Sequence, residues 1–481
     1  MEDLTIMDVI NTEKLQKLHE ASMAMLERTG MKFHHPEAIE ILKENGIRVE
    51  ENVAYFTEEQ VMYWVRKAPS AFTLYAKNPE HNIVIGGDEV NPAPPYGAAH
   101  VITKDGNRRP GTIEDYVNYA KLFHANDDYH VDGGLMVQPS DIDIPTSCLS
   151  MFYATYTHSD KALMVTAGKR EYMEALMEAL GEAFDGKEML KKYPRALTIV
   201  NANTPLQLDI TMTDVLITFA KYGQPFVVAS CAMAGSTAPV TLAGTIAMTN
   251  AEVLSTIALA QMVNPGTPVI YASQSTTSDM RTGQVAIGSP EGALCYKYCA
   301  NLAKFYQLPC RGGGALTDSK VVDTQAGYES MITLMADWEN HMNFIIHSAG
   351  ILDGYAATSY EKVISDFEIV RYVKRYMRDF EVNEKTVPLD LIDEVGHDGE
   401  FLTKDHTFEY CHTEPLTPTI SSRGNVSDNL HQFEINVEKR YNQLMEKYQM
   451  PTNDEKTLAK IKEILVSQGV DSDLLASIDK M

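Results

Sequence analysis

The sequence predicts an α/β protein built on a (β/α)8 barrel, with a helical extension before the barrel and further helices after it. From about residue 111, short apolar segments alternate with longer segments whose apolar residues have helical spacing. This alternation indicates strands that pair in parallel. In addition, a glycine-bearing loop at Met233 leads into a small-residue helix, a turn at Asn264–Gly266 and a buried strand, which together form one αβ unit of such a sheet.

Seven strands and seven helices follow from this alternation. The expected strands are His130–Met136, Ala162–Thr166, Ala196–Val200, Pro225–Ala229, Pro268–Ala272, Leu308–Gly312 and Asn343–Ile346. The expected helices are Thr112–His124, Ile144–Thr157, Arg170–Ala183, Met212–Lys221, Leu242–Met262, Glu291–Phe305 and Gly327–Glu339. The eighth strand is expected near Gly350–Thr358. An open doubly wound sheet is the alternative, but no Gly-x-Gly-x-x-Gly motif follows an early strand.

The 481 residues are enough for one barrel with extensions at both ends. Residues 1–110 are expected to form an N-terminal extension of helices and short strands, and residues 111–380 the barrel. Residues 381–481 are expected to form a C-terminal extension. It would be loop-like over 386–425 and helical over about 429–448 and 454–468. We expect this extension to pack on the barrel or on a second subunit, so the chain is expected to be a homo-oligomer.

Charge and composition limit the classes of partner. The formal net charge of −25 argues against nucleic acid and anionic membrane surfaces, because both repel an acidic protein. The six cysteines are too few and too scattered for a disulfide framework. The N-terminus lacks the pattern of a signal peptide, and no run of about 18 apolar residues suggests a membrane span. We therefore expect a cytoplasmic protein.

Function in a (β/α)8 barrel is carried by the loops after the carboxyl ends of the strands. At these positions the sequence has mostly amide, hydroxyl and small residues: Gln138, Thr166, Gly168, Asn201, Asn203, Ser230, Ser273, Gln274, Gly312, Gly313, Gly314, Thr317, Asp318 and His347. The set has no carboxylate pair, no strand-end lysine for a Schiff base and no Gly-x-Ser-x-Gly motif. Hydrolase and aldolase chemistry is therefore disfavoured.

Several of these residues have both a structural and a functional interpretation. His347 ends an apolar strand and is either a core histidine bonded to the backbone or a donor to a substrate carboxylate. Asn201 either forms a turn or contacts a ligand. The glycines Gly312–Gly314 either form a tight turn or let a large ligand approach the backbone. Tyr96 and Tyr355 are either packing residues or walls of a cage for an organic cation.

No metal site is expected. Cys295 and Cys299 lie four residues apart on an expected outer helix, and Cys411 precedes His412. Neither pair has a third ligand at a recognisable spacing, so we interpret the cysteines as small core residues.

Nine segments of the chain resemble, in order and spacing, the trimethylamine methyltransferase superfamily, whose members move a methyl group from an amine to a corrinoid protein. These segments are Phe33–Pro36, Asn201–Leu206, Met233–Gly244, Gly288–Ala293, Gly312–Lys320, Asp323–Glu329, Gly350–Gly354, Ser359–Lys362 and Phe401–His406.

The resemblance implies a (β/α)8 barrel, a separate corrinoid-binding protein that docks over the mouth of the barrel, and no metal bound by this chain. The archaeal trimethylamine enzymes of this superfamily carry pyrrolysine, whereas this chain has only the twenty standard residues. It therefore resembles the non-pyrrolysine branch, whose members demethylate quaternary amines. With this resemblance, Gly312, Gly313, Gly314 and Asp318 are expected to face the corrinoid.

The polar residues at the mouth suit a quaternary amine. Its nitrogen already carries a positive charge, so the departing amine is neutral and the displacement needs no proton transfer. We expect His347 and Gln274 to hold the carboxylate of a betaine, with Tyr96, Tyr355 and Asn201 as further substrate contacts. Glycine betaine is the first candidate substrate, and proline betaine, carnitine and γ-butyrobetaine are alternatives. A non-catalytic small-molecule-binding barrel or a lyase also stays open.

Overall fold

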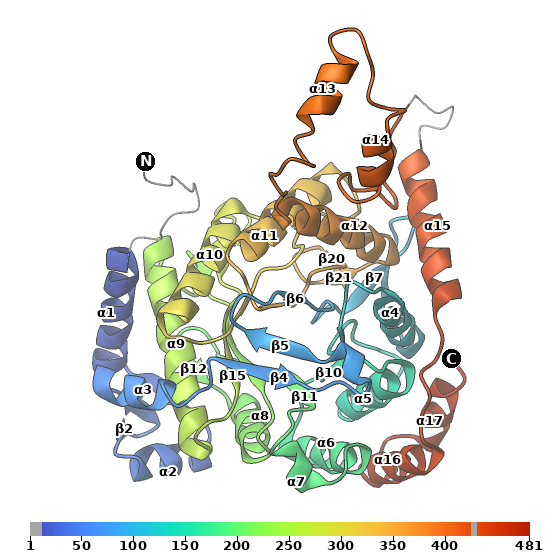
Figure 1. Cartoon of the computed structure of the whole chain (residues 1–481). Coiled ribbons are helices and arrows are strands. Elements are labelled where there is room, and N and C mark those ends of the chain that lie inside the picture. Colours follow the sequence, from blue (N-terminus) through green and yellow to red (C-terminus); the bar gives the residue numbers. More distant parts are fainter. Residues whose placement is uncertain (1–11, 425–430) are drawn as a thin grey trace.

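Eight parallel strands form the central sheet of the chain, which the computed structural model describes over residues 12–424 and 431–481 (Figure 1). In spatial order the sheet runs β6, β19, β18, β15, β13, β11, β10 and β9. Its strands are β6 (Asn91–Pro92), β9 (Val131–Gly133), β10 (Ala162–Met164), β11 (Ala196–Asn201), β13 (Phe226–Ser230), β15 (Val269–Ser273), β18 (Cys310–Gly312) and β19 (Phe344–Ile345). The seven strands expected from the sequence are confirmed, with ends that differ by up to three residues.

The expected position of the eighth strand was wrong. Residues 350–358 instead hold β20 (Ile351–Leu352) and β21 (Ala357–Thr358), which join β7 (His100–Ile102) and β8 (Arg108–Pro110) in a separate four-stranded sheet. The eighth barrel strand is β6, which pairs with β19 in parallel. The sequence pattern did not reveal β6, because this strand has only two residues and lies in a proline-rich segment without an apolar run. The barrel therefore takes a strand from the segment before residue 111.

Backbone hydrogen bonds connect the two ends of the sheet beyond β6 and β9. Gly97 N donates to Leu135 O at 2.8 Å, and Gln138 N donates to Ala98 O at 2.7 Å. The N-terminal segment thus closes the barrel against the segment that follows its first long helix. Closure removes an open sheet edge, which would otherwise expose unpaired backbone groups.

Helices surround the sheet, as the alternation predicted. They are α4 (Ile113–Ala125), α5 (Ser147–His158), α6 (Arg170–Ala183), α7 (Lys187–Leu190), α8 (Ile210–Lys221), α9 (Leu242–Val263), α10 (Pro290–Phe305), α11 (Thr324–Glu339) and α12 (Tyr360–Met377). Side-chain caps fix several starts: Thr112 forms a capping box with Asp115, Ser289 accepts from Gly292 N, and Asp323 accepts from Ala326 N.

The amino end of the barrel is closed by an antiparallel hairpin of β4 (Ala71–Leu74) and β5 (Ile83–Gly86), followed along the chain by β6. Figure 1 shows this hairpin lying across the ring of strands. Leu74 and Ile85 are buried in one cluster with the inward-facing barrel residues Leu197, Ile270 and Phe344. Apolar side chains thus fill the interior at this end, and a ligand site has to be sought at the other.

The first helices pack on the outside of the barrel at α9. This extension consists of α1 (Thr12–Arg28), β1 (Met31–Phe33), α2 (Pro36–Glu44), β2 (Arg48–Glu50), β3 (Val53–Tyr55) and α3 (Glu58–Val65), and η1 (Pro79–His81) follows between β4 and β5. Helices α1, α2 and α3 all contact α9. Among the described residues, α9 alone has the length and apolar composition of a membrane span, and 83% of that window is buried in the fold. No membrane span was expected from the sequence. The apolar composition of α9 is explained by its burial, because the barrel strands cover one side of the helix and α1, α2 and α3 cover another.

The C-terminal helices α15 (Gln432–Lys447), α16 (Glu455–Ser467) and α17 (Ser472–Ile478) pack along the barrel on α4 and α12, on α6 and on α5, respectively. The first two were predicted, although residues 429 and 430 lie outside the described part of the chain, and α17 was missed. The loop expected over 386–425 contains two short helices, α13 (Leu389–Val395) and α14 (Asp405–Tyr410). The sequence did not reveal these two helices because they are short and lie in a highly charged segment. Figure 1 shows both on the outside of the barrel.

Candidate active site at the barrel mouth

The carboxyl ends of the strands form the mouth of the barrel, and a small sheet of β14 (Met233–Ala234), β16 (Thr276–Ser278) and β17 (Val285–Ala286) rises from the loops there. Cys231 and Asn201, which lie at the ends of neighbouring strands, are both exposed. Burial nevertheless raises the pKa of the Cys231 thiol; nearby Arg311 opposes this shift and Glu252 adds to it. Cys231 is thus accessible and yet close to buried groups, and we infer from this that it lies in a recess at the mouth.

His347 is held in this recess in its neutral form. Its Nδ1 accepts a hydrogen bond from Tyr96 N at 3.1 Å, which assigns the ring proton to Nε2. Burial lowers the pKa of His347 well below its ordinary value, and the positive charge of Arg311 lowers it further. The imidazole is therefore a neutral N–H donor rather than a cation or a general acid. The backbone of His347 has a φ of 65°, an uncommon conformation for a non-glycine residue.

Gln274 and Tyr355 form a second polar pair beside His347. Gln274 Nε2 donates to Tyr355 Oη at 2.7 Å and to Gly313 O at 3.0 Å. Because the carbonyl of Gly313 requires a donor, the opposite orientation of the amide is excluded. Tyr355 Oη accepts this bond and keeps its own proton for another acceptor. The ring centroids of His347 and Tyr355 lie 5.0 Å apart, so these two side chains are direct neighbours.

Tyr96 completes the group that the sequence predicted. It is half-buried and packs on the apolar cluster inside the barrel. Burial raises the pKa of its phenol to about 12. The structure therefore brings Tyr96, His347, Gln274 and Tyr355 together, although they come from four separate segments of the chain.

The residue at the centre of this group is Arg311, which the sequence analysis missed. Its neighbours across the sheet are Ala272 and Phe344, which belong to the interior cluster, so its side chain is directed into the barrel. The residue is 3% exposed. It makes no ion pair with any described residue, and its Nε lacks a hydrogen-bond partner. A guanidinium stays protonated in proteins, so this is a buried positive charge without a protein counter-ion.

The charge of Arg311 acts on four titratable side chains at the barrel mouth. After burial, which is the larger cause, it lowers the pKa of His347 and opposes the rise in the pKa of Tyr96, Tyr355 and Cys231. This common influence indicates that the four side chains lie near the guanidinium. Such an arrangement suits an anionic ligand group.

Asn201 lies across the mouth from this cluster. The adjoining loop is fixed by Glu252, whose Oε1 accepts from Leu206 N at 2.6 Å and whose Oε2 accepts from Ser230 Oγ at 2.5 Å. Burial raises the pKa of Glu252. Asn201 is exposed, and its role as a substrate contact stays a prediction.

The glycines Gly312, Gly313 and Gly314 are buried, and the structure explains the last two by close packing. A Cβ on Gly313 would lie 2.0 Å from Asp337 Oδ2, and one on Gly314 would lie 2.6 Å from His347 O. Gly314 N also donates to Asp337 Oδ2 at 2.7 Å. These glycines let the loop after β18 reach the backbone that positions His347. Their expected orientation toward a corrinoid stays a prediction.

Asp318 likewise has a structural partner. Its two carboxylate oxygens accept from Ile287 N and Gly288 N, both at 3.1 Å. Burial raises its pKa, and these bonds oppose the rise. Asp318 therefore fixes the start of α10 against the loop after β18, and an additional contact with a corrinoid stays a prediction.

The cysteines fall into two groups. Cys148, Cys295, Cys299 and Cys310 are buried, as expected for core residues, and burial raises the pKa of each thiol. Cys411 is partly buried on the outer segment, and Cys231 lines the recess. Within residues 12–424 and 431–481, no group of three or more His, Cys, Asp and Glu side chains has a metal-binding arrangement.

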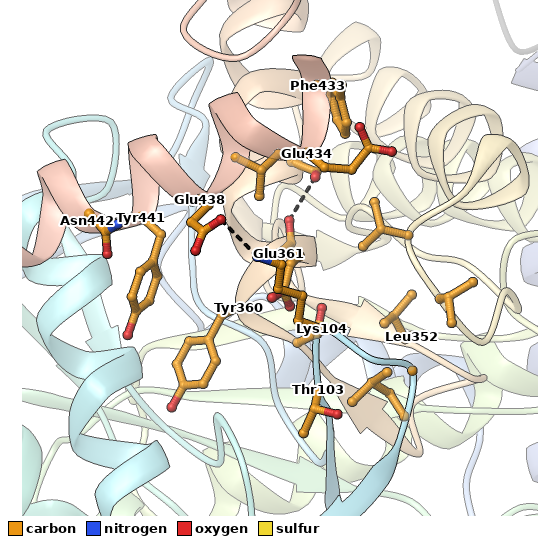
Figure 2. Close-up of a pocket in the computed structure, with 17 residues that line it drawn as sticks. Thr103, Lys104, Leu352, Tyr360, Glu361, Phe433, Glu434, Glu438, Tyr441 and Asn442 are labelled. Carbon is orange, nitrogen blue, oxygen red and sulfur yellow. Dashed lines mark hydrogen bonds and ion pairs between the residues drawn. The ribbon is translucent and has the colours of Figure 1, made fainter. Parts of the chain in front are cut away.

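A separate groove of about 520 Å³ lies outside the barrel, between β7, α12 and α15. Figure 2 shows its polar rim, where Lys104 and Glu438 form an ion pair of 2.8 Å. The groove contains none of the strand-end residues that surround Arg311, and its only lysine is paired. We therefore assign the candidate active site to the barrel mouth rather than to this groove.

A family model described as trimethylamine methyltransferase (MTTB) matches residues 1–468. The chain belongs to this family. It is 42% identical over 466 residues to the glycine betaine methyltransferase of Desulfitobacterium hafniense (strain Y51), with 96% of this chain and 97% of that protein covered. It is 31% identical to the L-carnitine:corrinoid methyltransferase of Eubacterium limosum, with 91% and 93% covered.

The fold is shared with a solved structure, that of the monomethylamine methyltransferase MtmB from Methanosarcina barkeri. The two align with a TM-score of 0.54 over 97% of this chain and 89% of that one, at 10% identity. The family membership and the barrel expected from the sequence are thus both confirmed, and the chain is a member of a methyltransferase family.

We predict that Gly314→Ala is strongly destabilising. Gly314 has a φ of 125°, and the added Cβ would meet backbone atoms of Ile346 and His347 rather than a flexible side chain. The free energy of unfolding should fall by about 2 to 4 kcal/mol. The control is Gly327→Ala on α11, where nothing lies within 4 Å of the added atom; it should be neutral or stabilising by up to about 1 kcal/mol. Denaturant unfolding of both variants tests this, and equal stabilities would contradict it.

Proposed function

We propose that this protein transfers a methyl group from a quaternary amine that carries a carboxylate, most specifically glycine betaine, to the Co(I) of a corrinoid held by a separate protein. The single observation that carries the proposal is the buried, unpaired guanidinium of Arg311 in the barrel mouth. The names of the relatives support it, since they include a glycine betaine methyltransferase and methyltransferases for L-carnitine and proline betaine. All of these substrates are carboxylated quaternary amines.

In this proposal three donors hold the carboxylate. Arg311 supplies the charge and a fork of N–H groups, His347 supplies its Nε2–H, and Tyr355 supplies its hydroxyl proton. A carboxylate bound there neutralises the buried guanidinium, whose desolvation is otherwise uncompensated. Gln274 keeps Tyr355 in place through the 2.7 Å bond between its amide nitrogen and the phenol oxygen.

The ammonium group would lie against Tyr96 and Tyr355. Aromatic faces attract a quaternary ammonium by roughly 0.5 to 2 kcal/mol each. The nearby charge of Arg311 repels the ammonium, and this repulsion decreases as the nitrogen becomes neutral during methyl transfer. An interaction that destabilises the charged substrate more than the transition state lowers the barrier.

The chemical step is an in-line displacement. The electron pair of Co(I) forms a bond to the methyl carbon while the carbon–nitrogen bond breaks, and the bonding pair stays on nitrogen. Glycine betaine becomes dimethylglycine and Co(I) becomes methyl-Co(III), with no proton transferred. The protein has to align donor and acceptor and exclude water, which fits a mouth with a neutral histidine and no acid–base pair. We place the corrinoid over the recess at Cys231, and we keep a cytoplasmic location as a prediction.

The direct test is methyl transfer by the purified protein. Glycine betaine and photochemically or chemically reduced cob(I)alamin should give methylcobalamin, seen in the absorption spectrum, and an equal amount of dimethylglycine. Proline betaine, carnitine and γ-butyrobetaine serve as competing substrates, and the highest kcat/KM identifies the preferred one. A spectrum that stays that of Co(I) with all four compounds would contradict methyl transfer and favour a binding protein or another reaction class.

Replacement of Arg311 should weaken recognition of the carboxylate specifically. Arg311→Met removes the charge and should raise the KM for glycine betaine by about 10- to 100-fold, as expected for a lost charge-assisted pair. Inhibition by tetramethylammonium, which lacks a carboxylate, should not weaken and should become somewhat stronger, because the variant removes the charge that repels the ammonium group. Arg48→Met, at an exposed arginine of the N-terminal extension, is the control and should leave both constants unchanged. Equal losses for the two ligands in Arg311→Met would refute the assignment.

Binding of glycine betaine should not depend on pH between about 6.5 and 8.5. Burial and Arg311 hold the pKa of His347 well below the ordinary histidine value of about 6.5, so the ring stays neutral throughout this window. Arg311 stays charged over the same range. The KM for glycine betaine, measured across the window, should therefore be constant. A KM that falls steadily as the pH is lowered would show that a protonated histidine binds the carboxylate, contrary to this account.

A further inference from the structure

Residues 379–419, which we call the arm, form an outlying segment in which no residue is buried. The arm contains α13 and α14, and Figure 1 shows both helices standing away from the barrel. Large apolar side chains are nevertheless frequent in it: Val382 is 75% exposed, and Leu402 and Phe408 are each 81% exposed. Phe380, Leu389 and Phe401 are exposed as well.

An ordered segment of this length with an apolar surface needs a partner. Ordering each residue costs about 1 to 2 kcal/mol of conformational entropy, and burial of apolar surface is what ordinarily offsets it. Within one copy of the chain the arm obtains no such burial. Concentrated exposed apolar side chains on a folded protein mark an interaction surface.

The arm leaves the barrel at the end opposite the mouth. Its base follows the C-terminus of α12, where Lys374 Nζ donates to Asp128 Oδ1 at 2.8 Å, and Asp128 precedes β9. The returning part of the arm is tied to the same place, because Arg375 Nε donates to Glu414 O at 2.8 Å. A corrinoid protein over the mouth would therefore lie at the other end of the barrel, which leaves the arm for a different partner.

The negative charge of the arm restricts the kind of protein surface to which it can bind. Between residues 379 and 414 there are eleven Asp and Glu against two lysines, Lys385 and Lys404. The partner surface must therefore be basic as well as partly apolar, although the chain as a whole has a net charge of −25.

The chain itself carries such a surface at the amino end of the barrel. A groove of about 660 Å³ is lined there by residues that include Phe72, Tyr75, Lys191, Lys192 and Lys221, with no Asp or Glu among the described residues that line it. Lys191 and Lys221 pair with Glu188 and Glu37 outside the groove, and Lys192 makes no ion pair with a described residue. Lysines and aromatic side chains thus meet in one concave surface.

We propose that the acidic, apolar arm docks into this basic groove of a second copy of the chain. Both surfaces belong to the end of the barrel away from the mouth, so a two-fold axis can bring each arm to the groove of the other copy. Two such reciprocal contacts give the arm the burial it lacks and leave both mouths open. The inference uses the proposed function only in placing the corrinoid protein at the other end of the barrel, and its test measures association rather than activity.

Sedimentation equilibrium of the full chain tests the proposal. The wild-type protein should be a dimer, and Leu402→Ser with Phe408→Ser should raise its dissociation constant at least about tenfold, as should Lys191→Glu with Lys192→Glu. Tyr328→Ser, at a side chain that is 60% exposed on α11, is the matched control and should leave it unchanged. All five replaced positions are exposed, and circular dichroism should show an unchanged fold.

Mixing the two variants provides a second measurement. The arm variant keeps an intact groove and the groove variant an intact arm, so one of the two contacts can form between them. Association in the mixture that exceeds that of either variant alone supports the proposal. A monomeric wild type, a dimer that either double variant leaves intact, or a mixture no more associated than its components would each overturn it.

Discussion

A single buried positive charge, that of Arg311, governs the organisation of the barrel mouth. A guanidinium inside a barrel is stable only if the surrounding structure supplies polar groups or a ligand supplies an anion. Here the protein supplies no carboxylate to it within the described residues, although Asp337 lies nearby on α11. Burial raises the pKa of Asp337 well above its ordinary value, and the hydrogen bond from Gly314 N and the charge of Arg311 oppose this rise. The mouth is thus prepared for an anion that arrives with the ligand.

The neighbours of Arg311 follow from the same constraint. Beside a fixed positive charge a second cation is disfavoured, and His347 accordingly stays neutral and offers an N–H group instead. The backbone is strained in this region, since His347 and Tyr355 both have positive φ values, of 65° and 74°. Strain of this kind persists where the surrounding structure imposes it, and it is common where side chains must be held for a ligand. Here the loop after β18 packs against the strained backbone, since Gly314 lies so close to it that an added Cβ would be 2.6 Å from His347 O.

The rest of the fold separates two ends of the barrel with different roles. The hairpin β4–β5 fills the amino end with apolar side chains, and the segment around β6 closes the sheet and then presents Tyr96 at the mouth. One short stretch of the chain therefore closes the barrel, completes its strands and positions a residue of the candidate site. In our proposals, the amino end takes part in contacts between copies, and the mouth binds the substrate and a corrinoid protein.

The sequence by itself determined the barrel, seven of its strands and the family, because apolar periodicity and motif order are local properties that survive without coordinates. It also pointed to Gln274 and His347 at strand ends and to Tyr96 and Tyr355 as aromatic residues of nearby loops. The structure brings these four together, and their contact with a substrate stays a prediction. The sequence could not reveal β6, whose two residues have no pattern of their own and become a strand only by pairing with β19. It could not reveal Arg311 either, because an arginine within an apolar strand is informative only once burial and the absence of a counter-ion are known. Only the tertiary structure decides the pairing of β6 and the environment of Arg311, because both depend on residues that are distant along the chain.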